Sequence, residues 1–321
     1  MTQAQDQNIL ELRAMTASLT QYAPVTSFLL SRVTDDIEEH GRISRAIADH
    51  PNATASLSGI RILAGVRWLI LAGRAPELGD LLHRMQDSRD WCVHAHRAWE
   101  LVTRAVLEHP EEIRNALDRP VQQHHPSRAA QLLEALGILS ASRVRLLELG
   151  SCAGLNLLVD RYRWFGPGWE WGDRHSAVRL ATPGRMPGEL QIVERAGCDL
   201  APRDPSSPAD TMILHSFLPP EREIDQMELD DALALAAEER PRVDRADAAA
   251  WLANELAQAP SDPSVYTVVW HSFFWCYLSA QQQHEIEGIL SSAAQRMSLA
   301  RAACEPHAWT LPPRLQLTVY S

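Results

Sequence analysis

The sequence predicts an α/β chain in which a helical N-terminal domain precedes a Rossmann-like sheet. Residues 1–140 place apolar side chains three and four positions apart and contain few β-branched runs, which is typical of amphipathic helices. From residue 144 onward, short β-rich runs alternate with helical stretches, as expected of a parallel sheet with crossover helices. A chain of 321 residues is long enough for two domains, which we assign to residues 1–140 and 141–321.

Helical periodicity defines the first domain. Leu101 and Ala105 exemplify its apolar spacing, and no convincing strand precedes residue 144. The segment SRAAQLLEALG predicts a helix with Ser127 as its N-cap and a stop at Gly137. We expect this domain to form a lid over a ligand pocket, or a homo- or heterodimer interface.

The second domain contains five predicted strands. They cover residues 144–149, 190–195, 241–246, 266–272 and 314–320. Helices are predicted at 225–239 and 280–290, where Ser279 and Gln282 fit a capping box at the start of the second helix. The aromatic and glycine-rich stretch at 162–181 predicts an inserted hairpin or loop.

Composition limits the kinds of partner. The formal charge is −11 and the pI is near 5.6, whereas nucleic acids and anionic membranes bind basic patches. All 30 basic residues are arginine, so Schiff-base chemistry, pyridoxal phosphate (PLP) and a Walker A loop, which need lysine, are excluded. We expect a small-molecule substrate and no nucleic acid.

The cysteines and apolar segments bear on the compartment. Five scattered cysteines without a C-x-x-C pair form no disulfide framework, which indicates a reduced, cytoplasmic protein. The most apolar segment, GIRILAGVRWLILAG, is interrupted by Arg61 and Arg67, and the amino terminus lacks a signal-peptide pattern, so we expect no membrane association. Cys92, His94 and His96 do not fit a zinc site, because ligands two apart do not share a helix face and no second pair completes four.

The stretch LLELGSCAGLN, residues 146–156, carries the main functional signal. One interpretation is Glu-x-Gly-x-x-x-Gly, a tight strand-to-helix turn in which Gly150 and Gly154 let backbone approach a nucleotide and Glu148 accepts hydrogen bonds. A second is Gly-x-Cys-x-Gly, a hydrolase elbow that presents Cys152 as a nucleophile. A third is a purely structural turn. Because the loop follows the first predicted strand, and a hydrolase elbow follows several, the nucleotide interpretation is favoured.

The same loop resembles motif I of S-adenosylmethionine-dependent methyltransferases, Glu-x-Gly-x-Gly-x-Gly, with Cys152 at the middle glycine. Over nearly its whole length the chain is similar to the DUF2332 family, a bacterial group with a predicted methyltransferase-like domain. The segments that carry this similarity are LAGVRWLILAG, ELGSCAGLNLLVDRYRW, GDRHSAVRL, ERAGCDLAPRDP, VDRADAAAWL and VVWHSFFWCYL. The resemblance implies a class I methyltransferase-like sheet, S-adenosylmethionine as cofactor and a pocket at the carboxyl ends of the strands.

The resemblance also implies cofactor-binding residues. Those of the loop are Glu148, Gly150, Cys152, Gly154 and Asn156. Near the end of the second strand, Glu194 or Asp199 would bind the ribose hydroxyls, because a carboxylate accepts two hydrogen bonds. Asp247 would lie near the adenine amino group. The alternative for each of these three acids is a solvated loop residue or a helix N-cap.

Catalytic residues are implied at the end of the fourth strand. His271 and Ser272 occupy the usual place of a methyltransferase catalytic motif, where a histidine acts as a general base or orients the substrate. The alternative for His271 is a buried histidine with satisfied hydrogen bonds. Glu221 matches a family aspartate and is expected at the mouth of the pocket.

The chain departs from the family pattern before the first strand. Relatives commonly read Thr-Asn-Glu ahead of an arginine, whereas this chain reads Gln123, His124, His125 and then Arg128. Imidazoles thus replace an amide and a carboxylate. His125, beside His124, becomes a second candidate base, and Arg128 a candidate anion-binding group.

Three functions fit these observations. The first is a methyltransferase-like enzyme that acts on a small polar metabolite in specialised biosynthesis, with alignment and a general base as its main contributions. The second keeps the fold without S-adenosylmethionine and catalyses an intramolecular displacement, that is a cyclisation, or an elimination. The third is a non-catalytic partner subunit with a degenerate site.

Overall fold

The protein forms two compact units in a computed structural model that describes residues 3–86, 91–306 and 313–320. The helical unit comprises the chain up to Gln123 together with Pro208–Met227. The sheet unit begins at His124 and resumes at Glu228. The sequence predicts a boundary near residue 140, whereas the last helix before the sheet packs against its strands and lies in the sheet unit.

The helical unit is built around one apolar core. Its described helices are α1 (Gln3–Leu19), α2 (Pro24–Glu38), α3 (Arg42–Ala46), α4 (Ser58–Leu71), α5 (Pro76–Gln86), η1 (Trp91–His94), α6 (Ala95–Glu108), α7 (Pro110–Leu117) and α9 (Pro208–Ser216). Leu101 and Ala105 of α6 are buried, which confirms the periodicity of this segment. Within the described ranges, no helix has the length and apolar character needed to cross a membrane.

The sheet unit contains a six-stranded, mostly parallel sheet, which confirms the α/β class. Its strands are β1 (Arg143–Leu149), β5 (Gln191–Asp199), β6 (Arg242–Arg245), β7 (Tyr266–Ser272), β8 (Leu299–Glu305) and β9 (Arg314–Tyr320). They lie in the order β6-β5-β1-β7-β8-β9, and only β9 runs antiparallel to its neighbour among the described strands. The order reverses at β1, and this is the point at which open α/β sheets form ligand crevices.

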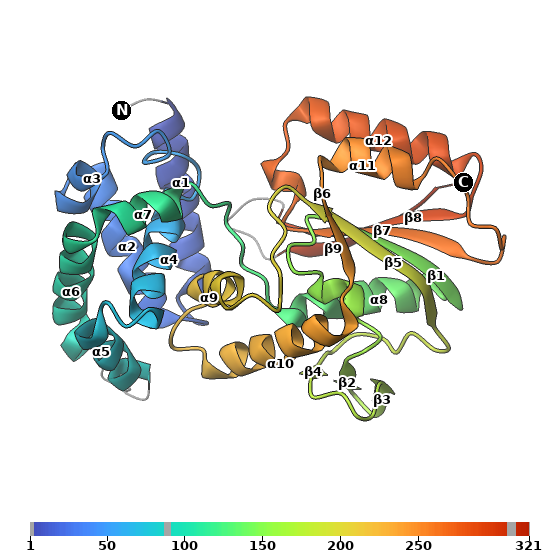
Figure 1. Cartoon of the computed structure of the whole chain (residues 1–321), viewed down its shortest axis with the longest axis horizontal. Helices are drawn as coiled ribbons and strands as arrows, with labels where there is room; N and C mark the ends of the chain where they lie inside the picture. Colours follow the sequence, from blue (N-terminus) through green and yellow to red (C-terminus); the bar gives the residue numbers. More distant parts are fainter. Residues whose placement is uncertain (1–2, 87–90, 307–312, 321) are drawn as a thin grey trace. The chain divides into compact units, whose positions relative to one another are not determined.

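Helices cover both faces of this sheet (Figure 1). The helical elements of the unit are η2 (Pro126–Arg128), α8 (Ala129–Leu139), η3 (Leu155–Leu158), α11 (Ala248–Glu255), η4 (Trp275–Tyr277) and α12 (Ala280–Ala294), and α10 (Glu223–Glu239) spans the division between the units. Leu147, Leu149 and Val269 pack with α11 and α12 on one face. Because strand side chains alternate, Glu148 points to the opposite face, which carries η3 and α8.

Several sequence predictions are confirmed and others are corrected. The strands at 266–272 and 314–320 have the predicted bounds, the capping box at Ser279 is present, and the insertion contains a hairpin of β2 (Arg163–Gly166) and β3 (Trp169–Gly172) beside β4 (Arg179–Ala181). Strand β8 was missed, because LARAACE lacks β-branched residues. Strand β5 continues past residue 195 to Asp199.

The predicted caps of α8 are wrong. Arg128 occupies the N-cap position instead of Ser127, which lies within the preceding η2. The helix also passes through Gly137 and ends at Ser140, whose φ is 53°. Gly137 serves close packing: an added Cβ would lie 3.2 Å from the carbonyl oxygen of Arg185.

We expect Gly197→Ala to reduce the free energy of unfolding by about 1–3 kcal/mol, because the added Cβ overlaps the Ser151 side chain and the strand has to shift. Gly288 is the matched control: it lies within α12, and its added Cβ meets no atom within 4 Å. Gly288→Ala should increase the free energy of unfolding by up to about 1 kcal/mol, through helix propensity. Urea unfolding followed by circular dichroism measures both, and similar values for the two variants would contradict this packing.

Candidate active site

The loop after β1 turns tightly and is held to the end of β5. Gly150 and Gly154 both have a φ of 73°, and Cys152 has a φ of 51°. The amides of Gly150 and Ser151 donate to the carbonyl oxygen of Cys198 at 2.9 and 3.0 Å. The glycines are therefore required by the backbone conformation, since positive φ is costly for other residues.

Side chains of the protein itself cover both glycines. A Cβ on Gly150 would lie 2.8 Å from the ring of Phe274, and one on Gly154 would lie 2.9 Å from Pro241 and 3.0 Å from Val243. An aromatic ring thus packs closely against Gly150.

The three acids assigned to the nucleoside have other contacts. Asp199 ends β5, and its two oxygens accept the N–H groups of Cys152 at 2.9 Å and Ala201 at 2.8 Å. Asp247 is the N-cap of α11 and accepts two N–H groups of its first turn, each at 3.1 Å. Glu194 lies inside β5, and not at its end, and it forms an ion pair with an arginine of β1. Each of the three acids is therefore bound by the protein itself.

Glu148 is a buried acid on the η3 face of the sheet. Its Oε1 accepts a hydrogen bond from Asn156 at 2.7 Å, and the side chain is almost completely buried. Burial raises the pKa of Glu148 to about 8; the hydrogen bond from Asn156 opposes this shift, and the charge of Asp199 adds to it. Glu148 is therefore largely protonated at neutral pH.

The Cys152 thiol does not suit nucleophilic catalysis. The side chain is fully buried, and this burial raises the pKa of the thiol well above its ordinary value. Because the thiolate is the reactive form, a neutral buried thiol does not support the hydrolase interpretation.

His271 forms a buried pair with Glu305 on the other face of the sheet. The distance from Nδ1 to Glu305 Oε1 is 2.7 Å, and the same carboxylate accepts the N–H of Phe274 at 3.0 Å. Trp275 stacks on the imidazole at a centroid distance of 5.1 Å, and the Arg301 guanidinium lies 4.9 Å from the centroid of that indole. Glu305 also holds the loop after β7 in place through this contact with Phe274.

The proton of neutral His271 is positioned by this pair. An ionised carboxylate only accepts hydrogen bonds, so Nδ1 carries the hydrogen and Nε2 keeps its lone pair. Nε2 is buried and makes no hydrogen bond within the described part of the chain. This arrangement of imidazole and carboxylate is the one that orients a general base.

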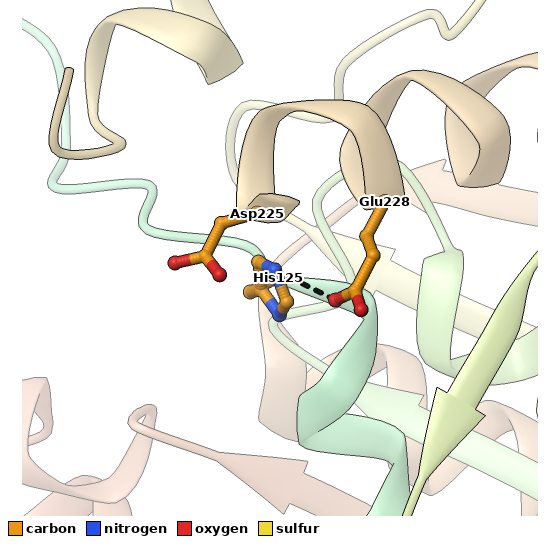
Figure 2. Close-up of side chains that lie close together, drawn as sticks. All are labelled: His125, Asp225 and Glu228. Carbon is orange, nitrogen blue, oxygen red and sulfur yellow. Dashed lines mark ion pairs between the residues drawn. The ribbon is translucent and has the colours of Figure 1, made fainter. Parts of the chain in front are cut away.

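His125 is oriented differently. Its Nδ1 accepts the N–H of Ser127 at 3.2 Å and lies 2.5 Å from the Ser127 hydroxyl, so the side chain caps η2. Its Nε2 lies 3.3 Å from a carboxylate oxygen of Glu228 on α10, as Figure 2 shows. Asp225, also drawn there, precedes Glu228 by one helical turn and is bound by the guanidinium of Arg222. In the neutral ring the proton is on Nε2 and faces Glu228.

His124 and Arg128 flank this cap. Burial lowers the pKa of His124 to about 3, and the nearby charge of Arg128 lowers it further, so this imidazole is neutral at physiological pH. The Arg128 guanidinium lies 4.3 Å from the ring centroid of Phe273. Phe273 directly follows β7 with a φ of 49°. Such strain in a non-glycine residue is concentrated at functional sites.

Glu221, the remaining predicted site residue, belongs to the helical unit. Its two carboxylate oxygens accept the backbone N–H and the hydroxyl of Thr26, each at 2.7 Å. Thr26 lies in the first turn of α2, where a negative charge is favoured by the helix dipole.

Three residues of this site could not be identified from the sequence. Glu305 ends the strand that was missed, Glu228 is one acid among several on α10, and Phe274 could only be assigned to the loop once β7 and its neighbours were placed. A strand prediction for 299–305 would have put Glu305 beside the end of β7, next to His271.

We expect the stability of the wild-type protein to fall by a few kcal/mol between about pH 5 and pH 8. Because the pKa of Glu148 is raised in the folded state, the folded protein holds a proton that the unfolded chain releases. This contribution to the free energy of unfolding is fully present below about pH 5 and is lost as pH rises through about 8. Glu148→Gln, which mimics the protonated acid, should flatten this decline, whereas Glu189→Gln at an exposed position should not. Urea unfolding at several pH values measures the slopes, and equal slopes in the wild type and Glu148→Gln would show that Glu148 is not the group responsible.

Comparisons with known proteins identify the family. No curated protein and no solved structure matches the chain. One family model, described as an uncharacterized protein conserved in bacteria (DUF2332), matches residues 12–321. The match includes the helical unit, the glycine loop and the β7 segment with His271. The chain therefore belongs to the DUF2332 family.

Proposed function

We propose that this protein is an enzyme that acts on a small polar metabolite by general base catalysis, without S-adenosylmethionine. The observation that carries the proposal is the buried pair of His271 and Glu305, which leaves a lone pair on Nε2 at the carboxyl end of β7. The reaction class is an intramolecular displacement, that is a cyclisation, or an elimination.

His271, Glu305 and Arg128 have separate roles in such a displacement. His271 Nε2 takes a proton from a nucleophilic group of the substrate, and Glu305 stabilises the imidazolium that results. The nucleophile forms a bond to a carbon of the same molecule, and the leaving group departs with the electron pair of the broken bond. We assign the binding of that anion to Arg128, whose guanidinium lies against Phe273, two residues after His271. Since Nε2 is buried and Trp275 stacks on the ring, the Trp275 side chain has to move aside for the substrate to reach Nε2.

His125 acts as a positioning residue in this scheme. Both of its ring nitrogens face groups of the protein, Ser127 and Glu228, and protonation of Nδ1 would break the cap of η2. The base is therefore assigned to His271, and His125 fixes the position of Arg128 through η2.

Methyl transfer is the second candidate. The strand order supports it, because β6-β5-β1-β7-β8 corresponds to the order 3-2-1-4-5 of Rossmann-like sheets, and the glycine loop follows the central strand. Against it stand the Phe274 ring over Gly150 and the contacts that already occupy Asp199 and Asp247. No observation favours a non-catalytic partner subunit.

Titration with S-adenosylmethionine and S-adenosylhomocysteine separates the two reactions. We expect no saturable heat in isothermal titration calorimetry with either ligand up to about 1 mM, because the ring of Phe274 takes up the approach to Gly150. Saturable binding of either ligand would overturn the cofactor-independent proposal and favour methyl transfer.

Incubation with an extract of polar metabolites, followed by mass spectrometry, tests the base. We expect one substrate to lose an anionic group, with a rate that falls by roughly 100-fold or more in His271→Gln, the usual size of a general-base contribution. His284→Gln, at an exposed position of α12, is the matched control and should retain activity. Glu305→Gln should also alter the tautomer of His271 in nitrogen-15 NMR spectra; full activity of His271→Gln would assign the base elsewhere.

A further inference from the structure

Helix α4 carries one charged side chain on an apolar face in the helical unit. Ile60, Leu63, Ala64, Arg67 and Ile70 follow one another at helical spacing and all line one pocket of about 50 Å³. The other lining residues are mostly aliphatic, and they come from α1, α2, α5, α6 and the segment after α9. An arginine in such a lining requires a physical explanation, because a buried charge without a partner is costly.

The guanidinium of Arg67 has no hydrogen bond or ion pair to any described residue. The side chain is half-buried and its Nε is completely buried. Burial lowers the pKa of Arg67, and the charge of Glu221 offsets this only in part. Glu221 forms no ion pair with this guanidinium; its two oxygens accept hydrogen bonds from Thr26. By contrast, Arg114 in the same unit binds Asp49 at 2.7 Å.

Arg67 also lines a second pocket of about 360 Å³. The polar residues of this pocket include His83 and Glu223, and Leu82 and Pro220 line both pockets. The guanidinium therefore lies where a small apolar pocket adjoins a larger polar one. A ligand that matches both has an anionic head and an apolar tail.

We propose that the helical unit binds a short-chain monocarboxylate, with its carboxylate on Arg67 and its tail in the apolar pocket beside Leu63 and Ile70. The planar guanidinium matches a carboxylate through two parallel hydrogen bonds. A singly charged head suits the site better than a phosphate, because Glu221 and Glu223 lie close to it. The volume of about 50 Å³ admits a tail of a few carbons and excludes a long acyl chain.

Calorimetric titration of the full chain with sodium butyrate tests this site. We expect saturable binding of butyrate within about 10 mM. Acetate should bind more weakly because it lacks the tail, inorganic phosphate because it carries more than one charge, and butylamine because its charge is positive. Tighter binding of phosphate than of butyrate would overturn the assignment to a monocarboxylate.

Two variants test where butyrate binds. Arg67→Met should weaken butyrate binding at least 10-fold and should raise Tm in the absence of ligand, because it replaces an unpaired charge with an apolar chain of similar length. Ala64→Val should weaken butyrate more than acetate, because its added methyl groups enter the tail pocket. Arg42→Met, at an exposed position of α3, is the matched control and should bind as the wild type does.

The proposal is overturned if folded wild-type protein shows no saturable heat with butyrate, or if Arg67→Met binds it as tightly as Arg42→Met does. Circular dichroism of each variant confirms that it is folded. Because the site lies wholly within the helical unit, these outcomes are independent of whether His271 acts as a base.

Discussion

The attachment of the glycine loop to the end of β5 is the constraint on which the sheet unit depends. Successive amides of Gly150, Ser151 and Cys152 donate to Cys198 and Asp199, so the chain leaving β1 cannot extend beyond its neighbour and must turn. Since these three hydrogen bonds end on two adjacent residues of β5, the position of that strand sets the loop geometry. The same contacts give Asp199 a structural role, since its carboxylate holds the loop.

The two pairs of a histidine and a glutamate in the sheet unit show that the hydrogen bonds of the ring decide whether a histidine can act as a base. His271 and His125 each lie near a glutamate, but only His271 has its Nδ1 proton directed at the acid. His125 has its Nδ1 occupied by the backbone of η2, which makes it part of a turn. Proximity to a carboxylate alone therefore does not identify a base; the partner of the other nitrogen does.

The sequence predicted much of the sheet because its strands combine β-branched residues with clear boundaries, as in the segment from Tyr266 to Ser272. It also placed His271 at a strand end. The sequence could not identify Glu305, because an alanine-rich strand has no distinctive periodicity. It also could not predict the contact of Phe274 with Gly150, because this contact depends on how the backbone is placed. Asp247 was given two interpretations, and its contacts are those of the helix N-cap.

The helical unit is interrupted in sequence, since Pro208–Met227 lies far from the other residues that build it. Ile213 and Phe217 from this segment are buried in its core. During synthesis on the ribosome, the N-terminal helices therefore emerge long before their apolar surface can be completed, and β1 and β5 are made in the interval. The helical unit cannot be completed until about half of the sheet unit has been synthesised. The two units are therefore linked in the order of folding as well as by covalent continuity.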